Sequence, residues 1–265
     1  MPTRWTRRFM NNKMSLQGLI DLQPPVLIAH RGDKTRYPEN TLASFEAAVE
    51  AGAEMIELDI TLSRDREMVV IHDDTLERTT NGEGAVGEHS LAELKKLDAG
   101  SWFDKSFKGE QIPTLSEVLA QVNRRAIVNI EIKKSAFENP APNDAIEIQL
   151  ISLIQEMDLA DFVIISSFEE RLLQRISVAN PSLALGVISL EEMNGNTIGM
   201  LKEMGAYSWH GWYATMTADQ VKQMHDNGFR VFSFTVNEME VFEQLSEMGV
   251  DGMFTDDCPL FRNRP

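Results

Sequence analysis

Cysteine is almost absent from the 265 residues, with Cys258 alone. The chain therefore cannot form a disulfide within itself and carries no cysteine-based zinc site. No run approaches the roughly 18 consecutive apolar residues that a transmembrane helix requires. The basic first residues are not followed by the apolar stretch of a signal peptide. Together these absences predict a cytoplasmic protein without stable membrane insertion.

Basic residues are also few, with 25 Lys and Arg against 41 Asp and Glu and a formal net charge of −16. Such a charge repels nucleic acid and anionic membranes, so we expect no nucleic-acid partner. A ligand that contains phosphate would need local compensation by a metal ion and a few fixed cations in a cleft. Hydrophobic residues make up 43% of the chain, which is typical of a globular protein with a sizeable core.

From residue 26 onward, short β-branched runs alternate with longer amphipathic segments, a pattern typical of βα units around a parallel sheet. The predicted strands are Val26–His30, Met55–Leu62, Ile127–Lys133, Phe162–Ser167, Leu183–Ser189, Ala206–Trp212, Val231–Val236 and Gly252–Thr255. The predicted helices are Thr41–Glu50, Leu115–Val122, Ala145–Met157, Glu169–Ala179, Asn196–Met204, Ala218–Asn227 and Glu238–Met248. This order predicts one (β/α)₈ TIM barrel over residues 21–265, preceded by a flexible basic leader at residues 1–20.

One connection is too long for a simple barrel. About fifty residues separate the second strand from the helix at Leu115, whereas βα loops usually have about two to six. We therefore predict an insertion at about residues 66–112, with a short strand at Met68–His72 and a short capped helix at Ser90–Leu97. Long βα connections lie at the catalytic face of a barrel, so the insertion is expected to wall one side of a site.

Carboxylates interrupt two of the apolar strands. Glu57 and Asp59 share one face of the second strand, and Glu131 shares a face of the third strand with Lys133. Carboxylates aimed together at a barrel lumen repel each other unless a positive charge lies between them. Three carboxylates suit a hard divalent cation, Mg²⁺ or Ca²⁺, and Lys133 would face the same cleft as a phosphate contact. An ion pair between Lys133 and Asp59 or Glu131 remains the competing explanation.

Two histidines end strands near these carboxylates. His30 and Arg31 close the first strand, and His72 ends the short strand of the insertion. Two histidines beside a bound phosphate can divide the proton transfers, and a guanidinium binds phosphate in a bidentate fork. His89 and His225 are expected at the surface. For His210, near the end of the sixth strand, contact with a substrate in the cleft remains an open alternative to a structural role.

Several linked motifs carry these residues in a fixed order. They are His30-Arg31-Gly32, Pro38-Glu39-Asn40-Thr41, Glu57-Leu58-Asp59, His72-Asp73 and Glu131-Ile132-Lys133. With them, residues 26 to about 260 resemble the glycerophosphodiester phosphodiesterase family. The resemblance implies a TIM barrel that hydrolyses a small-molecule glycerophosphodiester to glycerol 3-phosphate and an alcohol, using one divalent cation. Mg²⁺ is the first choice of cation, with Ca²⁺ and Mn²⁺ as alternatives.

The resemblance also implies roles for single residues. His30 and His72 become the acid/base pair, and Glu57, Asp59 and Glu131 become the metal ligands. Arg31 and Lys133 become phosphate contacts, and Phe234 becomes a substrate contact. Glu39 is expected either to orient a histidine or Arg31, or only to belong to the start of a helix. Phe234 stands where the family commonly has tryptophan, so an apolar contact is kept and an indole N–H donor is lost.

Two other functions stay open at this point. One is a lysophospholipase D or phospholipase-type activity on larger lipids, which an apolar rim around the site would favour. The other is a non-catalytic phosphate-binding barrel. Retention of three buried carboxylates and both histidines argues against the latter, because buried charge is costly when it is unused.

Overall fold

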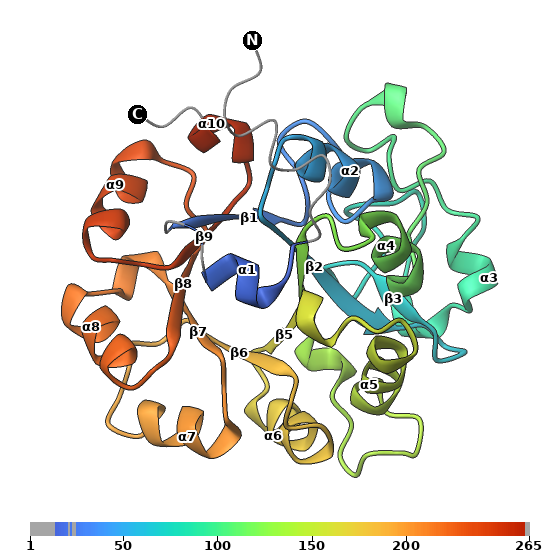
Figure 1. The fold of residues 1–265 in the computed structure, drawn as a ribbon. Helices are drawn as coiled ribbons and strands as arrows, with labels where there is room; N and C mark the ends of the chain where they lie inside the picture. Colours follow the sequence, from blue (N-terminus) through green and yellow to red (C-terminus); the bar gives the residue numbers. More distant parts are fainter. Residues whose placement is uncertain (1–13, 21, 23–24, 263–265) are drawn as a thin grey trace.

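Eight parallel strands close into a barrel in the computed structural model, which describes residues 14–20, 22 and 25–262 (Figure 1). They are β1 (Val26–His30), β2 (Met55–Leu62), β4 (Ile127–Ile132), β5 (Val163–Ser167), β6 (Ala184–Ser189), β7 (Ser208–Trp212), β8 (Arg230–Phe234) and β9 (Gly252–Thr255). Each strand pairs in parallel with its neighbours, and β1 pairs with both β9 and β2, which closes the ring. The predicted (β/α)₈ barrel is confirmed.

Helices surround the barrel and follow the predicted segments closely. They are α2 (Leu42–Glu50), α4 (Leu115–Val122), α5 (Ile146–Glu156), α6 (Glu170–Ala179), α7 (Thr197–Met204), α8 (Ala218–Asp226) and α9 (Met239–Glu247). Several begin one residue late because the predicted first residue is the N-cap. Thr41, for example, is extended and its side chain accepts a hydrogen bond from the Ser44 N–H. A short helix after the last strand, α10 (Cys258–Arg262), was not predicted.

Alternation along the strands separates two layers of the core. Ile28, Met55, Ile127, Ile164, Phe232 and Phe254 form a cluster that fills the barrel interior. Their strand neighbours, such as Ala29, Ile56 and Val128, belong to the larger cluster between barrel and helices. The interior set fixes which residues further along each strand point toward the mouth of the barrel. No described helix is both long and apolar enough to span a membrane.

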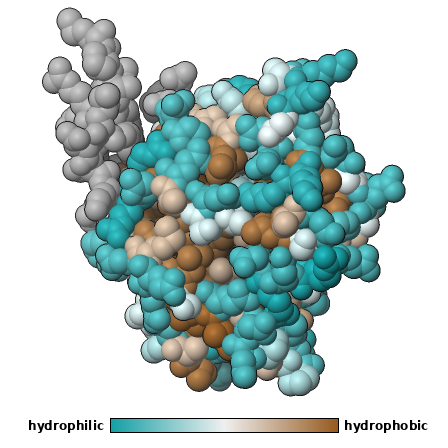
Figure 2. Space-filling model, turned by 90° about the vertical axis from the view of Figure 1, so that its right-hand side faces the viewer, coloured by the Kyte–Doolittle hydropathy of each residue, from teal (hydrophilic) through white to brown (hydrophobic). Residues whose placement is uncertain are grey.

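The long connection after β2 forms a folded insertion, as predicted. Its strand β3 (Met68–Val70) pairs antiparallel with β2, and its helix α3 (Leu91–Leu94) is capped by Ser90. A separate small core, including Val69, Leu76 and Leu94, holds it together. Strand β3 ends at Val70, which places His72 in the bend after the strand rather than in the predicted strand. Figure 2 shows the side of the molecule that carries the insertion, which is largely hydrophilic with scattered apolar patches.

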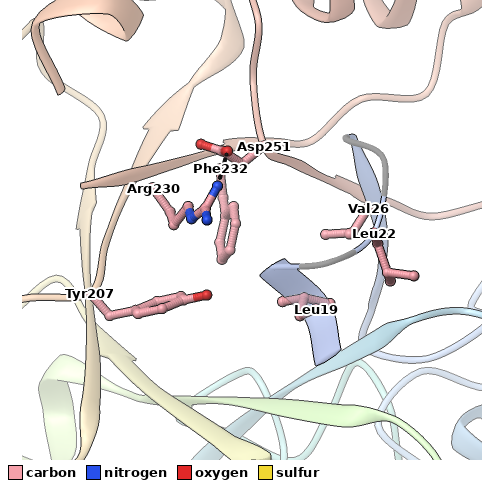
Figure 3. A pocket seen from close by; sticks show the side chains of 7 residues that line it. All are labelled: Leu19, Leu22, Val26, Tyr207, Arg230, Phe232 and Asp251. Carbon is pink, nitrogen blue, oxygen red and sulfur yellow. Dashed lines mark hydrogen bonds and ion pairs between the residues drawn. The ribbon is translucent and has the colours of Figure 1, made fainter. Parts of the chain in front are cut away.

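Part of the predicted leader is helical. Leu16–Ile20 form α1, and Leu19 is buried at the end of the barrel where the strands begin. A cavity of about 60 Å³ lies beneath it, lined by Leu19, Leu22, Val26, Tyr207, Arg230, Phe232 and Asp251 (Figure 3). Residues 1–13 lie outside the described residues, so the flexible leader and the domain boundary at residue 21 stay predictions.

His210 lies inside the barrel and not in the cleft that the sequence left open for it. It is fully buried, with ring centroids 5.1 Å from Phe232 and 5.3 Å from Phe254. Its Nε2 lies 2.8 Å from the Ser208 hydroxyl, while its Nδ1 has no hydrogen-bond partner. Burial lowers the pKa of His210 to about 3, so the imidazole stays neutral in the folded protein.

Acid should therefore destabilise the fold through this residue. Below pH 6.5 His210 becomes protonated in the unfolded chain but stays neutral in the folded protein. The free energy of unfolding therefore falls by about 2 kcal/mol on acidification to pH 5. We expect His210→Gln, whose amide can keep the contact with Ser208, to lose less stability than the wild type between pH 7 and pH 5 in urea denaturation. Equal losses in both proteins would show that His210 is not the group responsible.

Candidate active site

Three carboxylates meet at the mouth of the barrel. Glu57 and Asp59 come from β2 and Glu131 from β4, where Asp59 and Glu131 are direct register partners. One oxygen from each lies within 4.8 Å of the others. Glu57 and Asp59 are only 2% and 1% exposed. The strand alternation thus brings the predicted metal ligands together, as the sequence led us to expect.

Basic side chains compensate this cluster in part. Lys133 Nζ lies 3.3 Å from Asp59 Oδ1 and 3.1 Å from Glu131 Oε1, so the competing ion pair is also present. Arg31 donates its backbone N–H to Glu57 Oε2 at 2.9 Å, and its Nε lies 3.4 Å from Asp59. Two cations thus face three carboxylates, which leaves the cluster with excess negative charge when all are ionised.

The excess negative charge shifts the pKa values of the carboxylates. Burial, followed by the charges of Asp59 and Glu131, raises the pKa of Glu57 well above its usual value. Burial and Asp59 raise the pKa of Glu131 to about 7. Burial would also raise the pKa of Asp59, but Lys133 and Arg31 outweigh it and lower this pKa to about 2. Buried oxygen ligands with uncompensated charge fit a hard divalent cation.

Each predicted acid/base histidine is held by an aspartate. His30 Nδ1 lies 2.7 Å from Asp256 Oδ1, and His72 Nδ1 lies 2.6 Å from Asp73 Oδ1. A carboxylate at Nδ1 favours the tautomer that carries its proton there and leaves Nε2 as the basic nitrogen. Burial is the main cause that lowers the pKa of both histidines, so both are largely neutral at neutral pH.

Asp256 is a site residue that the sequence did not reveal. It follows β9, which neighbours β1. Its carboxylate accepts a hydrogen bond from Asn237 Nδ2 at 2.9 Å and forms an ion pair with Lys34 at 3.0 Å. No role was predicted from the sequence for Asp256, which follows the last predicted strand. The available signal was topological, because the first and last strands of a closed barrel are adjacent and their C-terminal ends meet.

Glu39 links Arg31 to the residues that hold His72. It accepts a hydrogen bond from Arg31 Nη1 at 2.9 Å and two from Arg78 at 2.8 Å, and Arg78 also pairs with Asp73. Burial alone would raise the pKa of Glu39, but Arg78 and Arg31 hold it at about 2. Glu39 therefore contacts Arg31 directly and reaches His72 through Arg78 and Asp73.

The turn after β1 has a backbone that this network requires. Arg31 has φ of 58°, and Gly32 has φ of 82° with its Cα so close to Ser44 that a Cβ would lie 2.4 Å from the hydroxyl oxygen. Only glycine fits there. Asn40 does not cap α2. Its amide donates instead to Asp59 Oδ2 at 2.9 Å, a contact that the sequence did not predict.

The other predicted residues occupy different positions. Phe234 ends β8, where its ring meets that of Phe168 edge to face with centroids 6.4 Å apart. His89 lies in the insertion with its Nδ1 2.9 Å from the Ala85 carbonyl oxygen. His225 is exposed and pairs with Asp251, near the cavity at the opposite end of the barrel. Neither of these two histidines lies with the carboxylate cluster.

The family described as the glycerophosphoryl diester phosphodiesterase family matches residues 30–259. The chain belongs to this family. A glycerophosphodiester phosphodiesterase from Caldanaerobacter subterraneus subsp. tengcongensis is 42% identical over 237 residues, covering 88% of this chain and 94% of that protein. A Bacillus subtilis glycerophosphodiester phosphodiesterase is 33% identical over 251 residues, covering 88% of this chain and 84% of that protein. The expected enzyme class, a phosphodiester hydrolase, is confirmed.

Solved structures agree with this assignment. A phosphodiesterase from Oleispira antarctica in complex with the product sn-glycerol-3-phosphate superposes with a TM-score of 0.83 at 30% identity, covering 90% of this chain and 95% of that one. A glycerophosphodiester phosphodiesterase from Agrobacterium tumefaciens superposes with a TM-score of 0.78 at 29% identity, covering 91% of this chain and 100% of that one. The family and the barrel therefore rest on sequence and structure together.

Proposed function

We propose that this enzyme hydrolyses glycerophosphodiesters to sn-glycerol 3-phosphate and an alcohol, with one divalent cation and a histidine acid/base pair. The observation that carries the proposal is the meeting of three carboxylates, two buried and one partly buried, with two aspartate-held histidines at one barrel mouth. Product-bound sn-glycerol-3-phosphate in the Oleispira phosphodiesterase supports the choice of substrate.

Charge neutralisation is the first requirement of this reaction, because a phosphodiester anion repels nucleophiles. Glu57, Asp59 and Glu131 would hold the cation, Mg²⁺ first and Ca²⁺ or Mn²⁺ as alternatives. When bound, the cation supplies positive charge for the nonbridging phosphate oxygens. Arg31 and Lys133, which already contact the cluster, would bind the same oxygens. With all these groups in place, the positive charges of the cation and the two basic side chains equal the negative charges of the three carboxylates and the phosphodiester.

Proton transfer falls to His30 and His72. Each is neutral with Nδ1 occupied by a carboxylate, so Nε2 of one can accept the proton of the nucleophile, either water or the neighbouring glycerol hydroxyl. The other, once protonated, donates to the oxygen of the departing alcohol. Asp256 and Asp73 orient the rings and stabilise the imidazolium that forms. Glu39 positions Arg31, and Phe234 would make an apolar contact with the substrate.

The proposal includes the cellular setting predicted from the sequence. A cytoplasmic location is in keeping with the single cysteine, and the absence of a nucleic-acid partner with the acidic composition. These parts rest on composition and are independent of the site geometry.

A metal-restoration assay tests the proposal. We would incubate the chelated protein with glycerophosphocholine or glycerophosphoethanolamine, with and without Mg²⁺, Ca²⁺ or Mn²⁺, and quantify glycerol 3-phosphate. We expect almost no release from the chelated protein and release at least about tenfold higher with the preferred cation. An Asp59→Asn variant should show no restoration. Stoichiometric binding of substrate without turnover under any cation would contradict the proposal and favour a phosphate-binding barrel.

A further inference from the structure

Lys34 is a partly buried cation at the barrel mouth, outside the set of residues that the motifs predicted. Its Nζ lies 3.0 Å from Asp256 Oδ1, the same oxygen that lies 2.7 Å from His30 Nδ1. The Lys34 side chain is only 20% exposed. By contrast, Lys222 pairs with Asp226 at the surface with its side chain 70% exposed. Lys34 therefore belongs to the pair of His30 and Asp256 rather than to the outer surface.

An ordered turn after β1 holds Lys34 beside this pair. The preceding residue, Asp33, is buried and only 3% exposed. Its backbone N–H donates to the Ser44 carbonyl oxygen at 3.0 Å, and its carboxylate accepts a hydrogen bond from Arg36 Nε at 3.0 Å. Both contacts fix the backbone next to Lys34. The ammonium is therefore preorganised beside Asp256.

The other polar groups of Asp256 are also occupied. Its Oδ2 accepts a hydrogen bond from Asn237 Nδ2 at 2.9 Å, and its backbone N–H donates to Asn237 Oδ1 at 2.9 Å. Burial would raise the pKa of Asp256, but the contacts with His30 and Lys34 hold it well below its usual value. The carboxylate is therefore ionised and fixed at both oxygens. Because His30 is largely neutral, the positive charge among these described contacts comes from Lys34.

The second histidine has a matching arrangement. Asp73 Oδ1 lies 2.6 Å from His72 Nδ1 and accepts a hydrogen bond from Arg78 Nη2 at 2.9 Å. Arg78 thus stands behind His72 as Lys34 stands behind His30, although the two cations come from different segments of the chain. This repetition indicates that each imidazole needs a cation on the carboxylate that holds it.

We infer that Lys34 is a positioning residue for His30 and acts through Asp256. The inference rests on the proposed function, in which His30 transfers a proton. The ammonium keeps the Asp256 carboxylate charged and oriented toward the Nδ1–H of His30, which leaves Nε2 for the reacting atoms. Without Lys34, Asp256 Oδ1 loses its charged partner and the carboxylate is free to turn away from the imidazole. Loss of Lys34 therefore slows proton transfer and leaves substrate binding unchanged.

Direct contact with the phosphate is the alternative role for a cation at this mouth. The two proposed phosphate contacts, Arg31 and Lys133, lie 3.4 Å and 3.3 Å from oxygens of Asp59, in the metal cluster. Lys34 instead lies at the Nδ1 side of His30, whereas Nε2 is the nitrogen assigned to proton transfer. This geometry favours action through the carboxylate.

A double-mutant cycle tests the inference. We would measure kcat and KM on glycerophosphocholine for the metal-loaded full chain as wild type, Lys34→Met, Asp256→Asn and the double variant. We expect Lys34→Met to lower kcat about tenfold, as loss of a hydrogen bond to a charged group does, with KM within about twofold of the wild type. In the Asp256→Asn background, Lys34→Met should lower kcat by less than about twofold, because the two residues act as one unit.

Two further variants make the cycle specific. Lys34→Arg keeps the positive charge and should recover most of kcat. Lys134→Met removes a lysine from the exposed segment after β4 and is the matched control, which should leave kcat unchanged. Thermal unfolding checks that each variant is folded at the assay temperature. Should Lys34→Met fail to fold, Lys34→Gln takes its place in the cycle.

The outcomes separate this inference from the proposed function. A kcat that Lys34→Met leaves near the wild-type value overturns the inference alone. A raised KM with unchanged kcat assigns Lys34 to substrate binding, and equal losses of kcat with and without Asp256→Asn show that Lys34 does not act through Asp256. An equal loss for Lys134→Met attributes the effect to net charge. Each of these results overturns the inference, whereas a wild-type chain without turnover under any cation overturns it together with the proposed function.

Discussion

Replacement of His72 by alanine is expected to lower kcat on glycerophosphocholine by about 10²- to 10⁴-fold, the usual contribution of a positioned acid or base. The imidazole is held by Asp73 at 2.6 Å and stands beside Asp59, whose charge acts on it. Alanine removes the proton carrier without removing a metal ligand. Metal affinity, measured by isothermal titration calorimetry, should therefore change little. The same result is expected for His30→Ala.

Two variants make this test specific. His89→Ala removes a histidine of the insertion whose ring contacts only the Ala85 carbonyl in the described hydrogen bonds, and kcat should stay near the wild-type value. Asp256→Asn keeps His30 but weakens the hydrogen bond between residue 256 and His30 Nδ1. The kcat value should therefore fall, and the pH profile of kcat should shift. A His72→Ala enzyme with near wild-type kcat would remove this residue from the acid/base pair.

Replacement of Glu57 by glutamine should weaken metal binding by more than about 100-fold, since loss of even a residue behind the ligands commonly costs about 10- to 100-fold. The same change should stabilise the metal-free protein. The raised pKa of Glu57 means that burial and neighbouring carboxylates make its ionised form unfavourable in the folded state. Glutamine removes that repulsion. In thermal unfolding, the chelated variant should have a higher Tm than the chelated wild type, and added cation should no longer raise it.

This pairing of effects distinguishes a metal ligand from a residue that only accepts the hydrogen bond of the Arg31 backbone N–H. If Glu57 only stabilised Arg31, its replacement would lower the Tm with and without cation. Glu243→Gln, at an exposed position of α9, provides the matched control and should alter neither metal affinity nor Tm. A chelated Glu57→Gln protein with a lower Tm than the wild type would contradict the proposed cation site.

The sequence predicted those parts of the site that lie within single strands or in neighbouring ones. Glu57, Asp59 and Glu131 were predicted because alternation fixes their side of the strand and β2 pairs directly with β4. Asp256 was missed because its partner His30 is 226 residues away in the sequence, and no local pattern marks Asp256 as a site residue. Arg78 was missed for a similar reason. Its bonds to Glu39 cross from the insertion to the first loop, and no local pattern predicts that contact.

The fold was predicted more completely than the site, with errors at the ends. Strand bounds agreed within two residues because β-branched runs alternate with amphipathic segments along the whole barrel. Helix α1 was missed because five residues carry too little periodicity to be distinguished from a leader.

Helix α1 also bears on the order in which the molecule assembles. Leu19 belongs to the interior cluster, to which β1, β2, β4, β5, β8 and β9 all contribute, so its binding surface combines strands from both ends of the barrel sequence. That surface does not exist until the ring of strands is complete. A segment that precedes the barrel in the sequence is therefore among the last to reach its native contacts. Its burial reports that the first and last strands have met.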